Sequence, residues 1–76
     1  MNTEKDLKEI ISRLSSDLVR CADAMEVGVK SAKQDYRMIL VGLLEAKIEL
    51  KELIGEEVPN YLRKSLKKAE RLVGLR

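Results

Sequence analysis

The chain has 76 residues, with 15 Lys and Arg against 13 Asp and Glu, and it contains no His, Trp or Phe. A core of this size is usually supplemented by disulfides, a metal or oligomerisation. Cys21 is the single cysteine, which excludes a disulfide within the chain and leaves too few soft ligands for zinc or iron. We therefore predict one domain, residues 1–76, that is stabilised by self-association.

Apolar residues recur at steps of three and four through most of the sequence. This spacing places one residue per turn on a single face of an α-helix, which predicts an all-α fold whose helices pack on one another. From residue 18 onward the stripe consists of Leu18, Ala22, Met25, Val29, Ala32, Tyr36, Ile39, Leu43, Ala46, Leu50 and Leu53.

The first two predicted helices cover residues 3–27 and 31–54. Thr3 and Asp6 have the spacing of a capping box at the start of the first helix. Gly28 suits the left-handed position that closes a helix. Ser31 and Gln34 have the spacing of a second capping box.

Because the apolar spacing crosses Gly28 without a change of phase, two folds remain open. In the first, residues 3–27 and 31–54 form an antiparallel hairpin that packs with a shorter third helix as a three-helix bundle. In the second, one helix runs over residues 3–54, since a glycine inside a helix costs only about 1 kcal/mol relative to alanine. We favour the hairpin because its two segments have nearly equal lengths.

The segment from Tyr36 to Leu44 is nonpolar around most of the helix circumference. A helix that is apolar on more than one side is covered on more than one side. This breadth predicts a homodimer centred on residues 38–48, where Gly42 would permit close approach of the backbones. The predicted dimer interface consists of Tyr36, Ile39, Leu40, Val41, Leu43, Leu44 and Ile48.

Gly55 and Pro59 separate the second helix from a third, which we expect to cover residues 59–73. Like-charge pairs four residues apart on this helix each destabilise it by about 0.2–0.5 kcal/mol. Three explanations fit this basic face: a solvated surface, a docking site for an acidic protein, or a weak site for a polyanion such as nucleic acid or an anionic membrane. The basic face consists of Arg63, Lys64, Lys67, Lys68 and Arg71.

The composition does not favour catalysis. Without His, the usual general base at neutral pH is absent. The four acids Glu45, Glu49, Glu52 and Glu56 form a ridge that we interpret as a solvated acidic face. Glycine-rich phosphate loops are also absent, so we expect no catalytic residue, no metal and no cofactor.

The leading hypothesis is a non-enzymatic helical interaction or regulatory module that self-associates through its second helix. The alternative is a small nucleic-acid-binding protein that uses the basic face of its C-terminal helix. No apolar run is long enough to span a membrane and no secretion signal is visible, so we expect a cytoplasmic protein. Abundant Glu and Lys with few amides are typical of heat-adapted proteins.

Overall fold

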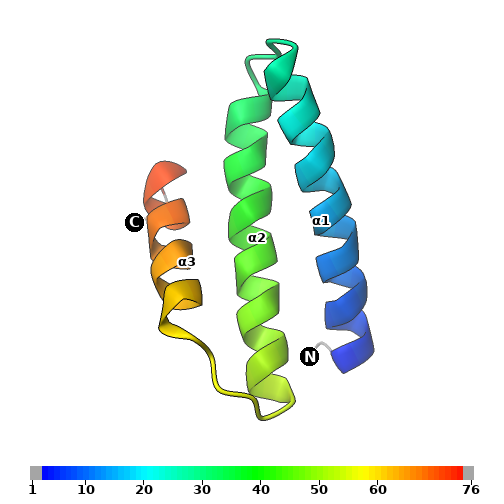
Figure 1. The fold of residues 1–76 in the computed structure, drawn as a ribbon, viewed down its shortest axis with the longest axis vertical. Helices are drawn as coiled ribbons and strands as arrows, with labels where there is room; N and C mark the ends of the chain where they lie inside the picture. Colours follow the sequence, from blue (N-terminus) through cyan, green and yellow to red (C-terminus); the bar gives the residue numbers. More distant parts are fainter. Residues whose placement is uncertain (1–2, 75–76) are drawn as a thin grey trace.

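The computed structural model describes residues 3–74, which form three consecutive helices that run up, down and up (Figure 1). α1 covers Glu4–Glu26, α2 covers Ala32–Leu53 and α3 covers Asn60–Leu72. Each helix begins and ends one residue inside its predicted range, and the outermost predicted residues are the helix caps. The all-α fold and the hairpin are confirmed, and a continuous helix over residues 3–54 is wrong.

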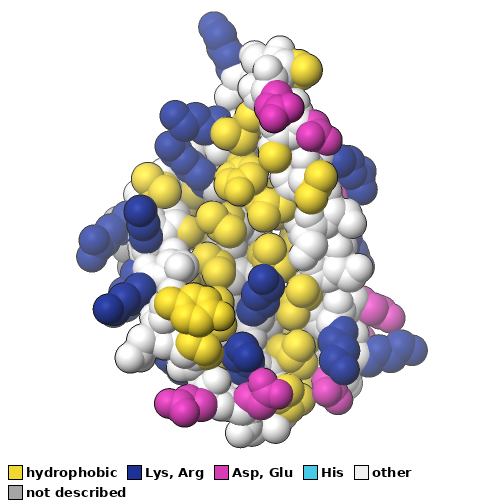
Figure 2. Space-filling view, viewed as in Figure 1, with side chains coloured by type: hydrophobic (Ala, Val, Ile, Leu, Met, Phe, Trp, Pro, Cys, Tyr) yellow, Lys and Arg dark blue, Asp and Glu magenta, His cyan; other side chains and the backbone are white. Residues whose placement is uncertain are grey.

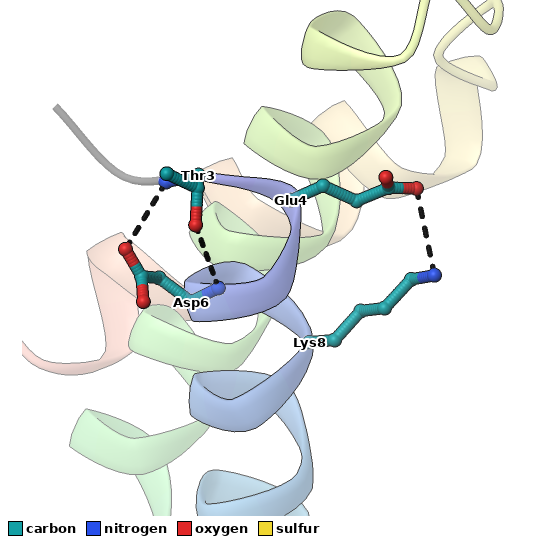
Figure 3. A network of polar contacts seen from close by, with 4 residues as sticks. All are labelled: Thr3, Glu4, Asp6 and Lys8. Carbon is teal, nitrogen blue, oxygen red and sulfur yellow. Dashed lines mark hydrogen bonds and ion pairs between the residues drawn. The ribbon is translucent and has the colours of Figure 1, made fainter.

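The N-terminus of α1 carries the predicted capping box (Figure 3). The Thr3 hydroxyl oxygen accepts a hydrogen bond from the Asp6 backbone N–H at 3.2 Å, and the Asp6 carboxylate accepts one from the Thr3 backbone N–H at 3.3 Å. An ion pair between Glu4 and Lys8, with N and O 3.4 Å apart, lies beside the box. Two of the backbone donors that a helix start leaves without helical partners are therefore satisfied locally.

Gly28 ends α1 as predicted, in the left-handed region at φ +86°. Its N–H donates to the Met25 carbonyl at 3.1 Å, and the Val29 N–H donates to the Ala24 carbonyl at 3.0 Å. These two bonds satisfy carbonyls at the end of the helix and reverse the chain. A residue with a side chain is strained at this φ, which explains why glycine stands here.

The predicted capping box at Ser31 is wrong, because the Ser31 side chain makes no capping hydrogen bond. Its backbone already has a helical conformation, at φ −70° and ψ −21°, whereas a capping residue usually has an extended backbone. Ser31 instead contributes its carbonyl, which accepts from the Asp35 N–H at 3.1 Å.

The helices form one layer with α2 in the middle (Figure 1). α1 packs on one side of α2 and α3 on another, while within residues 3–74 α1 and α3 do not pack on each other. The described chain measures 41 × 25 × 19 Å along its principal axes. The two broad faces of this layer are therefore covered only by side chains of the same three helices.

Two small cores flank α2. On the α3 side, Val41, Leu44 and Ile48 form a buried cluster with Leu62 and Ala69. Half-buried apolar residues complete this cluster: Leu40, Val58, Leu66 and Val73. The buried residues between α1 and α2 are Leu7, Ala32, Leu43 and Ala46.

Gly42 faces α1 within one chain. A Cβ atom added at Gly42 would lie 3.4 Å from Cδ1 of Leu14, an ordinary van der Waals distance. The neighbour that we expected from a second subunit is therefore Leu14 of the same chain.

We predict that Thr3→Ala lowers the free energy of unfolding by about 1 kcal/mol, because one backbone donor of α1 loses its capping partner. Ser31→Ala is the matched control and is expected to have little effect, since the Ser31 side chain caps nothing. Urea denaturation of both variants measures the difference. Equal losses would contradict the assignment of the two caps.

We predict that Gly28→Ala lowers the free energy of unfolding by about 1–2 kcal/mol, because alanine is strained at φ +86°. Gly42→Ala is the control, since Gly42 has a helical backbone and the new methyl group would meet Leu14 at van der Waals distance. Thermal denaturation should show destabilisation at residue 28 and none at residue 42. A loss confined to residue 42 would argue against this hairpin.

Candidate interaction surfaces

Most of the predicted dimer interface lies inside the single chain. Val41, Leu43, Leu44 and Ile48 are only 5–7% exposed. Three of them pack on α3 in the buried cluster, so a segment of the same chain covers the side that we assigned to a second subunit. The breadth of the apolar surface of α2 is thus explained within one chain, because α3 folds back along it.

Three residues of the predicted interface remain half-buried: Tyr36, Ile39 and Leu40. Ile39 lines a shallow hollow of about 330 Å³ together with Met38 and Cys21. According to the 100° step of the helix, Tyr36 and Leu40 lie within about 40° of the direction of Ile54, whereas Ile39 lies about 60° from it on the side of the hollow. The predicted interface is therefore divided between different surfaces.

A groove of about 440 Å³ crosses all three helices where α3 begins. Its apolar lining comes from Ile11 of α1, Leu50 and the C-cap residue Ile54 of α2, and Tyr61 and Leu62 of α3. Tyr61 is 66% exposed and Ile54 is 42% exposed. Figure 2 shows hydrophobic side chains continuing along this broad side of the molecule. Sequence reasoning missed the groove because its lining residues belong to three separate helices.

We call the apolar groove together with Tyr36 and Leu40 the apolar face. Charged side chains also line the groove: Lys47, Lys51 and Glu56. Lys51 and Glu56 pair with N and O 3.3 Å apart. The surface thus combines apolar, aromatic and charged groups.

The predicted basic face lies on the outer side of α3, where all five of its residues are exposed. Arg63 pairs with Glu52 of α2 at 3.9 Å, and both side chains are more than half exposed. Exposed pairs of this kind contribute about 0–1 kcal/mol. Within residues 3–74, Lys64, Lys67, Lys68 and Arg71 form no ion pair.

Two further cations, Lys33 and Arg37, continue the positive charge beyond the end of α3. Arg37 lies one turn before Val41, on the side of α2 that faces α3, and Lys33 lies one turn before Arg37. Figure 2 shows Lys and Arg side chains along the same edge of the molecule, from α3 to the N-terminal part of α2. We call this surface the basic patch: Lys33, Arg37, Lys64, Lys67, Lys68 and Arg71.

Sequence reasoning missed Lys33 and Arg37 because they join the basic face only when α2 and α3 lie side by side.

Two residues of the acidic ridge form ion pairs within the chain, since Glu52 pairs with Arg63 and Glu56 with Lys51. In the described part of the chain, no group of three or more His, Cys, Asp or Glu residues is arranged to hold a metal ion. No helix of residues 3–74 combines the length and apolarity needed to cross a bilayer.

Comparisons of the chain with protein-family models, with curated proteins and with solved structures find no match. The apolar face and the basic patch are therefore the two surfaces from which we infer what the protein binds.

We predict that Ile48→Ala lowers the free energy of unfolding by about 2–5 kcal/mol, because it leaves a cavity between α2 and α3. The loss should be the same at low and high protein concentration, since Ile48 is buried within one chain. Thermal melts over a hundredfold range of concentration measure this for the variant and for the unmodified chain. A loss that grows with concentration would place Ile48 between subunits.

Proposed function

We propose that the protein is a non-enzymatic helical interaction module that self-associates by stacking its apolar face on the same face of a second copy. The observation that carries this proposal is the single layer of helices with α2 in the middle. Stable domains usually bury the apolar sides of their helices between two layers. Stacking two copies face to face would supply the second layer.

The burial pattern supports this proposal. Within the described residues, Leu7 is the one side chain below 2% exposure. Ile11, Leu18, Tyr36, Leu40 and Leu50 are apolar and only half-buried. Covering such groups stabilises the assembly by about 25 cal/mol for each Å² of apolar area removed from water.

The size of the surface also supports a dimer. The broad side of the molecule measures 41 by 25 Å, an outline of about 1,000 Å². A standard protein–protein interface covers about 800 Å² on each partner. A two-fold axis through this side would bring the same residues of both copies together in one closed interface.

The chemistry of the apolar face resembles that of interfaces in general. Tyr36 and Tyr61 are the only aromatic residues of the chain, and the apolar face includes both of them. Interfaces are enriched in tyrosine at their centres and have charged residues at their rims.

The proposed interface differs in its residues from the dimer interface that the sequence predicted. Tyr36 and Leu40 remain in the proposed interface, joined by Ile11, Leu50, Ile54, Tyr61 and Leu62 of the groove. A cytoplasmic location belongs to the same proposal and is supported by the single cysteine, which suits a reducing compartment.

We predict that the double variant Ile54→Glu with Tyr61→Glu is monomeric at about 50 µM, whereas the unmodified chain is a dimer, because four carboxylates would be desolvated in the stacked interface. Sedimentation velocity measures the state, and circular dichroism checks that the helices remain.

The matched control is Met38→Glu with Val27→Glu, which should remain a dimer. Met38 and Val27 are 50% and 80% exposed. At 100° per residue, Met38 lies about 160° around α2 from Tyr36, and Val27 lies about 160° around α1 from Ile11, so both are opposite the apolar face. Val27 and Ile54 are both helix C-caps, so the two variants place equal charge in similar backbone positions. An unmodified chain that is monomeric and melts cooperatively at this concentration would overturn the proposal.

A further inference from the structure

We propose that the basic patch binds the phosphate backbone of a nucleic-acid duplex without reading its sequence. This activity would be separate from self-association. The patch follows the outer side of α3 and the N-terminal turns of α2, whereas the apolar face lies on a broad side of the layer. Residues 33–37 of α2 and residues 64–71 of α3, which are separate in the sequence, both contribute to the patch, which makes it a feature of the fold.

The charge of the patch is largely unpaired. Lys33, Lys64, Lys67, Lys68 and Arg71 are exposed, and Arg37 is half-buried. None of the six forms an ion pair within the part of the chain that the structure describes. In contrast, α1 balances part of its outer charge through the pairs Glu4–Lys8 and Asp17–Arg20.

Local helix stability does not explain these cations. Lys64 with Lys68 and Lys67 with Arg71 are like-charge pairs one turn apart, which destabilise a helix. Lys33 lies in the first turn of α2, where the helix dipole favours acids. A polyanion that neutralises all of these charges would remove both penalties at once.

The length of the patch fits a run of phosphates. Because α2 and α3 run in opposite directions (Figure 1), their shared cluster places Leu62 near Ile48 and Ala69 near Val41. Lys64 lies five residues from Ala69 and Lys33 eight residues from Val41, in opposite directions, which makes the patch about 20 Å long at 1.5 Å per residue. One strand of a duplex carries about six phosphates over 20 Å of its axis. The patch offers six cations over the same length.

The packing of α3 favours a nucleic acid over a membrane. Binding to a membrane surface combines cations with an apolar side that enters the lipid. The apolar side of α3 is instead turned against α2, with Leu62 6% exposed and Ala69 2% exposed. The outer side of α3 between Lys64 and Arg71 therefore presents charged side chains to solvent, as suits binding to a phosphate backbone.

Fluorescence anisotropy with a labelled 20-base-pair DNA duplex of arbitrary sequence tests the proposal. We expect micromolar affinity at 50 mM salt and a slope of log K against log salt near −5 for six contacts. Affinity should fall about a thousandfold between 50 and 200 mM salt. A duplex of unrelated sequence should bind within about twofold, because phosphate contacts carry no sequence information.

Two variants test the patch. The first variant changes four cations of α3 to Gln: Lys64, Lys67, Lys68 and Arg71. Its slope of log K against log salt should be shallower by about 4. The second variant changes Lys33 and Arg37 of α2 to Gln, and its slope should be shallower by about 2. Circular dichroism and thermal melts confirm that both variants fold. The charge-matched control changes four exposed α1 cations to Gln and should leave most of the binding intact: Lys5, Lys8, Arg13 and Arg20.

The proposal is overturned if the duplex does not bind at 50 mM salt, or if the α1 control loses as much affinity as the α3 variant. Vesicles with 30% anionic lipid and a poly-glutamate peptide serve as competing probes. Tighter binding to either one than to the duplex would also overturn it, and would identify a membrane or an acidic protein as the partner. Because monomeric and dimeric variants can both be titrated, this result is independent of self-association.

Discussion

The structure depends on α2 being shared between two neighbours. One side of this helix packs on α1 around Leu43 and Ala46, and another packs on α3 around Val41, Leu44 and Ile48. A helix that is apolar on several sides must be covered on several sides. The chain reverses after Gly28 and after Gly55, both at positive φ, and these reversals place α1 and α3 of the same chain against α2.

This arrangement places the remaining apolar groups on a broad side of the molecule. Because α1 and α3 do not pack on each other within residues 3–74, neither helix closes the layer over α2. Side chains such as Ile11, Leu50 and Tyr61 then share one groove although they come from different helices. A small chain with shallow burial gains most from covering such a surface, which is the physical basis of the proposed self-association.

The same folding back of α3 gathers the cations. Leu62 and Ala69 attach α3 to α2, so the opposite side of α3 carries Lys64, Lys67, Lys68 and Arg71 into solvent. Since α3 is shorter than α2, the first turns of α2 extend beyond it (Figure 1). These turns add Lys33 and Arg37 to the same edge. The apolar contact between two helices thus determines where the positive charge accumulates.

Local chemistry made the helices predictable from the sequence. The spacing of apolar residues, the pair Thr3 and Asp6, and the glycines at 28 and 55 located both ends of α1 and the end of α2 within one residue, because caps and left-handed turns depend on near neighbours. The basic face of α3 was predictable for the same reason.

Only the tertiary structure decided which surface covers which. Val41 and Ile48 have the pattern of an intersubunit contact, yet Leu62 and Ala69 of the same chain cover them. An apolar helix side specifies that it must be buried but not by which segment, since the hydrophobic effect has no direction. The sequence by itself therefore determined the helices and the chemistry of each side, while their placement in one layer determined the apolar face and the extent of the basic patch.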